Sequence, residues 1–90
     1  MNAKEFKEMV GGRQVRVFGF HPGPVSRGYN HGVHILADAW DCGETVGFSI
    51  GGYTWPAVDS WRVTEAGLFG FYTAAAYGAD EPGLVCLLYQ

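Results

Sequence analysis

Two segments of the chain alternate between apolar and polar residues, and this alternation constrains the fold more than any other feature. In RQVRVFGF (13–20) two valines flank an arginine, and in ETVGFSI (44–50) Val, Phe and Ile alternate with small or polar residues. Successive side chains of a β-strand point to opposite faces, so a period of two residues predicts strands with one buried face. We therefore expect a sheet as the body of the fold.

A helix is predicted with most support at the start of the chain. Asn2 and Glu5 have the spacing of a capping box, in which side chains hydrogen-bond the free N–H groups of the first turn. Gly11 and Gly12 end the run. Three apolar side chains share one helical face and are expected to dock the helix on the sheet: Phe6, Met9 and Val10.

Further strands are predicted from apolar runs bounded by turn residues. GVHILADAW (32–40) and LVCLLY (84–89) are apolar on both faces, which is typical of buried strands. DCGE (41–44) has the composition of a tight hairpin turn, because Gly43 can adopt a positive φ. Since LVCLLY would promote aggregation as a bare edge, we expect it at the centre of the sheet or paired across a homodimer.

Residues 64–77 leave two interpretations open. The apolar side chains have the spacing of an amphipathic helix, and three alanines favour that helix. Gly67 and Gly70, however, would each destabilise a helix by about 1 kcal/mol. We favour a hairpin here, followed by another turn at GADEPG (78–83).

These elements predict an α+β fold with a short N-terminal helix and an antiparallel β-meander of five or six strands. Ninety residues correspond to one domain, so we expect a single compact domain over 1–90 with the helix at about 2–10 and the sheet at about 13–89. Sheets of this kind often curl into a small barrel, which is the architecture we consider for this one.

The composition indicates a protein that meets a partner. Charged residues make up 17% of the chain against a usual value of about 25%, whereas 16% of the residues are aromatic. The formal net charge of −3 and the scattered basic residues argue against direct binding of nucleic acid. The first ten residues contain no continuous hydrophobic stretch, so we expect a soluble cytoplasmic protein without membrane association.

The chain carries no catalytic signature that we can identify. A phosphate loop, a dinucleotide fingerprint, paired CxxC motifs, HExxH and a nucleophile elbow are all missing from the sequence. Cys42 falls in a tight turn and Cys86 in an apolar strand, so we expect free thiols without an activating environment. The sequence therefore predicts a protein that is not an enzyme and binds no cofactor.

Residues 21–34, HPGPVSRGYNHGVH, are predicted to form a loop of about twelve residues between two strands. Ser26, Arg27 and Gly28 are candidates for an anion site because they offer exposed amides beside a guanidinium. Tyr29 and Asn30 are candidates for contacts to a protein partner. A metal site would combine the three histidines with Asp38 or Cys42, but the spacing gives them no shared face, so none is expected: His21, His31 and His34.

A second candidate surface lies in GGYTWPAVDSW (51–61). Tyr53, Trp55 and Trp61 surround a proline in a stretch with one charged residue, Asp59. Core packing explains any single one of these rings, but tryptophan and tyrosine dominate binding hot spots. We expect at least one ring to be exposed for recognition, with Asp59 and nearby carboxylates steering a basic partner.

Three functions are compatible with these features. The leading hypothesis is a non-catalytic protein-binding protein, inhibitor-like or adaptor-like, that occupies a surface of a larger protein or protein complex. Small phage or mobile-element proteins that block a bacterial defence complex are one such population. The alternative is a small-ligand or nucleotide-binding β-barrel with the 21–34 loop as its lid, and the third is a small metal-dependent or histidine-dependent enzyme.

Overall fold

The computed structural model describes residues 1–23, 27–73 and 81–90. The described elements are α1 (Ala3–Val10), β1 (Gln14–His21), β2 (Arg27–Cys42), β3 (Thr45–Ile50), β4 (Tyr53–Val58), β5 (Ser60–Val63), β6 (Gly67–Tyr72) and β7 (Gly83–Tyr89). The strands form one antiparallel sheet in the order β4-β3-β2-β1-β7-β6-β5. The predicted α+β class is confirmed, but the described sheet has seven strands instead of five or six.

The strand that the sequence did not predict is β4. It contains Pro56, which has no backbone N–H and is tolerated in a sheet at edges or bulges. Both conditions hold here, because β4 is an edge strand and its pairing with β3 shifts in register between Val46 and Phe48. The glycines and the proline of this region therefore mark a turn and an edge strand.

The prediction of a long loop over residues 21–34 is wrong. β2 already begins at Arg27 and pairs with β1 from His21↔Arg27 to Gln14↔Ile35. Ser26, the first residue of the expected anion site, lies outside the described residues. The glycines of this segment are compatible with a strand because Gly32, at φ +84°, lies in a β-bulge instead of a turn.

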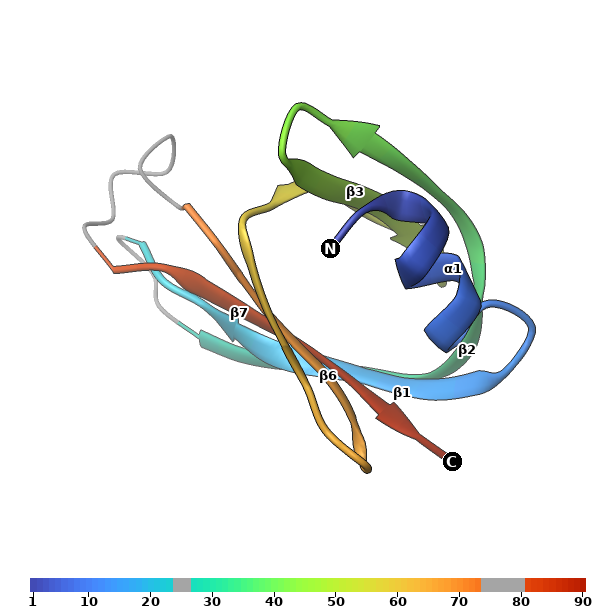
Figure 1. Cartoon of the computed structure of the whole chain (residues 1–90). Helices are drawn as coiled ribbons and strands as arrows, with labels where there is room; N and C mark the ends of the chain where they lie inside the picture. Colours follow the sequence, from blue (N-terminus) through green and yellow to red (C-terminus); the bar gives the residue numbers. More distant parts are fainter. Residues whose placement is uncertain (24–26, 74–80) are drawn as a thin grey trace.

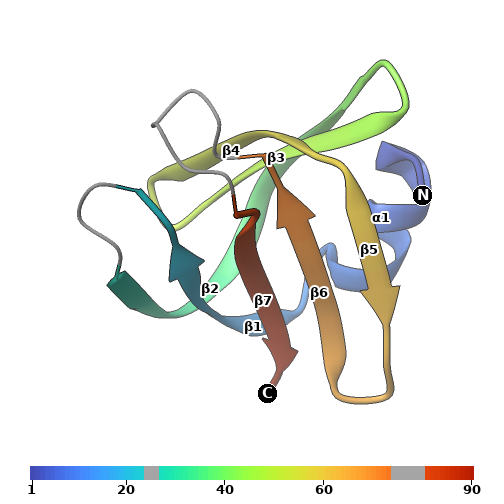
Figure 2. The same cartoon turned by 90° about the vertical axis from the view of Figure 1, so that its left-hand side faces the viewer.

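The sheet folds over into two layers (Figures 1 and 2). The 16-residue strand β2 belongs to both: its first half pairs with β1, and its second half pairs with β3 after a register shift between Leu36 and Asp38. The edge strands β4 and β5 follow each other in the chain, but the described pairings include none between them. The sheet therefore does not close into the barrel that we considered.

Helix α1 covers β2 and β3 on the concave side of the sheet (Figure 1). The Asn2 side chain accepts a hydrogen bond from the Glu5 backbone N–H at 2.8 Å, which confirms the predicted cap. Phe6 and Val10 are fully buried, and Met9 is partly buried against the same core. The Phe6 ring lies 5.0 Å from the Phe48 ring and 5.1 Å from the Trp61 ring, measured between centroids. This core closes one end of the folded sheet.

The predicted turns are confirmed where the structure describes them. Gly43, at φ +61°, begins the two-residue turn between β2 and β3. Residues 64–72 form a turn and a strand, so the hairpin is the correct interpretation for that part of 64–77; residues 74–80 lie outside the described residues. β7 pairs with β1 on one side and with β6 on the other, as expected for a central strand.

Both cysteines are free thiols, as predicted: Cys42 is exposed and Cys86 is buried. Burial raises the pKa of the Cys86 thiol, so this group stays protonated at neutral pH. Among the described residues, no helix has the length and hydropathy needed to cross a lipid bilayer.

Candidate functional site

A hollow with mainly aromatic walls opens beside the hairpin end of β1 and β2. It has a volume of about 330 Å³. We call it the aromatic pocket, and define it by six lining residues: His21, Arg27, Tyr29, His31, Trp55 and Tyr72. An adjoining hollow of about 300 Å³ shares three of these residues and extends along β4 past Pro56 and Ala57.

The pocket and the helix are connected by stacked rings. The Trp55 ring stacks on Phe48 at 4.9 Å, and Phe48 in turn contacts Phe6 of α1. Trp55 is only 8% exposed, because one of its sides belongs to this core while another part lines the hollow. The folded sheet is therefore filled by the helix core at one end and holds the pocket beyond Trp55.

A β-bulge directs His31 toward the pocket. Val17 pairs with Gly32 and Phe18 pairs with Asn30, so His31 is an extra residue of β2 without a partner on β1. The Asn30 side chain accepts a hydrogen bond from the Gly32 N–H at 3.0 Å and stabilises this geometry. Bulges re-aim side chains in this way, and they are frequent beside binding sites.

The His31 imidazole is stacked between two tyrosines. Its centroid lies 3.6 Å from that of Tyr53, with 8° between the ring planes, and 4.9 Å from that of Tyr29. Burial, and then the charge of His34, lower the pKa of His31 below its ordinary value of 6.5. The ring is therefore neutral at pH 7 and adds no charge to the pocket wall.

Two hydroxyl groups lie at the pocket wall between the layers. The Tyr29 hydroxyl donates a hydrogen bond to the Leu84 backbone carbonyl at 2.7 Å, and the Tyr72 hydroxyl lies 2.9 Å from His21 Nδ1. Burial raises the pKa of Tyr29 far above its ordinary value, and the neighbouring Tyr72 adds to this effect. Both contacts hold rings in place, and the Tyr29 phenol stays protonated throughout the neutral range.

The structure brings together some of the residues that the sequence singled out. Tyr29, Trp55 and Arg27 line the pocket, and Tyr53 flanks it through its stack on His31. Asn30 supports the bulge instead of facing the hollow. Gly28 is exposed and pairs with Phe20 on β1.

The two remaining candidates lie elsewhere. Trp61 is partly buried against the helix core, and its indole N–H is buried without a hydrogen-bond partner among the described residues. Asp59 is exposed at the connection between β4 and β5, where it lines a separate hollow. Trp61 and Asp59 therefore lie outside the aromatic pocket.

Sequence reasoning missed the role of Tyr72. It considered the histidines as metal ligands, rejected that site and left them as ordinary loop residues. His21 and His31 serve here as pocket walls. The described residues contain no cluster of three or more His, Cys, Asp or Glu side chains placed to hold a metal ion. A signal for His31 was present, since an Asn-His-Gly sequence within a strand pattern is compatible with a glycine bulge.

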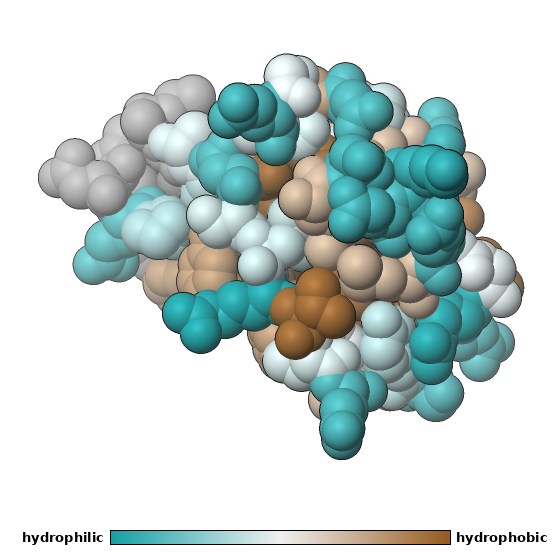
Figure 3. Space-filling view, in the orientation of Figure 1, coloured by the Kyte–Doolittle hydropathy of each residue, from teal (hydrophilic) through white to brown (hydrophobic). Residues whose placement is uncertain are grey.

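The outer face of β1, β7 and β6 is apolar. Register places Phe18, Cys86 and Phe69 in one cross-strand row, and Phe20, Leu84 and Phe71 in the next. Phe20 is 38% exposed, and α1 lies on the opposite side of the sheet. Figure 3 shows a different aspect of the molecule, where hydrophilic residues predominate and apolar ones gather in the lower centre of the view.

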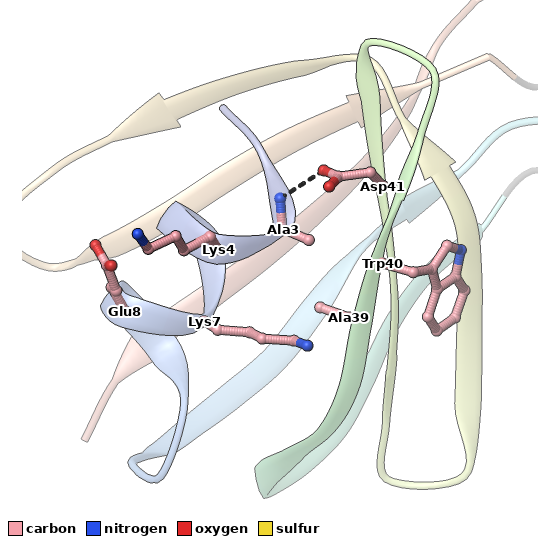
Figure 4. Close-up of a pocket in the computed structure, with 7 residues that line it drawn as sticks. All are labelled: Ala3, Lys4, Lys7, Glu8, Ala39, Trp40 and Asp41. Carbon is pink, nitrogen blue, oxygen red and sulfur yellow. Dashed lines mark hydrogen bonds between the residues drawn. The ribbon is translucent and has the colours of Figure 1, made fainter.

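A further hollow, between α1 and β2, is lined mainly by polar and charged side chains (Figure 4). Asp41 accepts a hydrogen bond from the Ala3 N–H at 2.8 Å, so its carboxylate already caps the start of α1. Lys7 lies 3.7 Å from Asp38 on the same side. These contacts attach the helix to β2 and account for the Asp41 and Lys7 side chains without a ligand.

Comparison with protein-family models found no matching family, and comparisons with curated proteins and with solved structures found no significant match. The assignment of a function therefore rests on the geometry of the pocket.

Proposed function

We propose that the chain is a non-catalytic binding protein whose aromatic pocket receives a small planar ring. The observation that carries this proposal is the pocket wall, in which five of the six lining side chains are aromatic or imidazole rings. Concave, largely apolar hollows of about 300–1,000 Å³ with a few polar groups are typical of small-ligand sites. The proposal retains the small-ligand alternative from the sequence, without the closed barrel and the lid.

The arrangement supports binding better than catalysis. The Tyr29 hydroxyl already donates its hydrogen bond to the Leu84 carbonyl, and the Tyr72 hydroxyl lies 2.9 Å from His21 Nδ1. Cys42 and Cys86 are absent from the residues that line the pocket. A general base needs hydrogen-bond access to the proton it removes, whereas a stacking wall only needs a flat ring.

Thermal unfolding with and without neutral ring probes tests this proposal. Indole and adenosine are the probes, and cyclohexanol is the aliphatic control. A ligand at 100 times its Kd adds about 2.7 kcal/mol to the free energy of unfolding. For a domain of this size, each kcal/mol raises Tm by about 4–8 °C. We expect a rise with at least one aromatic probe and none with cyclohexanol.

Matched variants locate the effect. His31→Ala removes a pocket wall without touching the fully buried core, so it should abolish the ligand-induced rise in Tm. Trp40→Ala removes a ring from β2 that does not line the pocket, so its ligand-induced rise should equal that of the unmodified chain. A panel in which no aromatic probe raises Tm contradicts the proposal.

A second candidate function is supported by the apolar outer face of β1, β7 and β6. Two neighbouring rows of apolar side chains on one face suit a protein partner, in line with the inhibitor-like or adaptor-like hypothesis. Phe20→Ser would then weaken binding of that partner and leave the pocket unchanged. That such a partner belongs to a bacterial defence complex stays a prediction.

A further inference from the structure

We propose that the ligand of the aromatic pocket carries a negative charge next to its ring, and that Arg27 binds this charge. The inference rests on the proposed function and names the class of ligand: an aromatic ring with a short anionic arm. Nucleoside monophosphates and aromatic carboxylates share this chemistry.

Arg27 is the one lining residue with a permanent positive charge. It is the first residue of β2 and pairs with His21 across the hairpin, so the strand register fixes its backbone at the pocket rim. Its side chain is exposed. Among residues 1–23, 27–73 and 81–90, the ion pair in the structure joins Lys7 to Asp38 and does not involve Arg27. The planar guanidinium can therefore offer two parallel N–H donors to a carboxylate or phosphate.

Among the described residues, no carboxylate at the pocket balances the charge of Arg27. The chain has nine acidic residues and a formal net charge of −3, yet the described residues that line the pocket and its extension along β4 include no Asp or Glu. A cation at the edge of an apolar hollow attracts anions, because low-polarity walls focus its field into the hollow.

The aromatic rings of the pocket and the positive charge of Arg27 also lie at different depths. Trp55 and Tyr72 are buried, and they form the inner wall of the hollow, whereas Arg27 is exposed at its rim. A ligand that stacks its ring against the inner wall would direct a short substituent toward Arg27. The pocket volume of about 330 Å³ lies near the lower limit for small-ligand sites. This volume favours a ligand with a monocyclic or bicyclic ring system over a dinucleotide.

Calorimetric titration of the whole chain with paired probes tests the inference. Each pair has the same ring with and without the charge: adenosine 5′-monophosphate against adenosine, and indole-3-acetate against indole-3-acetamide. We expect the charged member of at least one pair to bind about tenfold more tightly, as a charge-assisted hydrogen bond would provide. The pair with the larger difference distinguishes a nucleotide from an aromatic acid.

Arg27→Gln and Arg62→Gln are matched variants with the same change in net charge. Arg62 is exposed on β5 and does not line the pocket. Arg27→Gln should reduce the difference in affinity between the charged and the neutral member of a pair to about twofold or less. The affinity for the neutral member should stay unchanged. Arg62→Gln should preserve the tenfold difference.

Equal affinity for charged and neutral members in the unmodified chain would overturn the inference while the proposed function stands. A preference that Arg62→Gln reduces as much as Arg27→Gln would also overturn it, because the effect would then come from the overall charge. Failure of every probe to bind would reject the proposed function and this inference together.

Discussion

At the scale of single residues, the position of Gly32 decides whether the pocket has its histidine wall. Gly32 has φ +84°, a backbone conformation that residues with a Cβ adopt only with strain. That conformation allows β2 to insert one residue between the partners of Val17 and Phe18. The inserted residue is His31, so the bulge and the wall depend on the same glycine.

Gly32→Ala should therefore destabilise the fold by about 1–2 kcal/mol and weaken ligand binding at the same time. Gly12→Ala is the matched control. Gly12 has φ +74°, and an added Cβ would meet no atom within 4 Å at either position, so the cost is conformational in both variants. Chemical denaturation should show similar losses in the free energy of unfolding for Gly32→Ala and Gly12→Ala. Equal ring-probe affinity in both variants would show that the bulge does not set the pocket.

The residues that could be predicted from the sequence are those whose roles are local. Asn2 caps α1 and Gly43 turns the β2–β3 hairpin, because each acts on its own neighbours in the chain. Tyr72 and His21 are 51 positions apart and meet through a hydrogen bond that only the sheet order creates. No local pattern contains that information, so the pocket could not be assembled in advance.

At the scale of elements, β7 is an interior strand with two different faces. It pairs with β1 and β6, and Val85 and Leu87 on its inner face are fully buried. Its outer face carries Leu84 and Leu88, which are partly exposed. The central position of β7 was predictable because an apolar run without charges would aggregate at an edge.

Substitution by lysine at neighbouring positions of β7 should separate its two faces. Leu87→Lys places a charge among fully buried side chains and should cost about 3 kcal/mol or more, or prevent soluble expression. Leu88→Lys can extend its ammonium into solvent from the outer face and should cost about 1 kcal/mol or less. Similar melting temperatures for both variants would show that the faces are assigned incorrectly.

The edge strand β4 explains why the number of strands was underestimated. Pro56 and the two glycines before β4 match the usual signals for a loop. An edge strand needs hydrogen bonds on only one side, so a proline at a register shift costs little. Edge or central position depends on the sheet order, which period-two patterning does not specify.

At the scale of the whole molecule, a sheet folded into two layers leaves two ends to fill. The core under α1 fills one of them through Phe6, Phe48 and Trp61. Trp55 forms the boundary between this core and the pocket. Beyond Trp55, the hollow is lined by rings that cover one another only in part. The aromatic residues are therefore divided between a core, a site and the outer face of β1, β7 and β6.

Titration of ¹⁵N-labelled protein with a ring probe, followed by amide and indole N–H chemical shifts, tests the central claim most directly. The three tryptophans report on different regions: Trp55 on the pocket, Trp61 on the helix core and Trp40 on β2 outside the pocket. We predict that the Trp55 indole signal and the backbone signals of residues 27–32 shift in a saturable way while those of Trp40 and α1 stay in place. Largest shifts at Trp40, at α1 or on the outer face of β7, with Trp55 unchanged, would contradict the account.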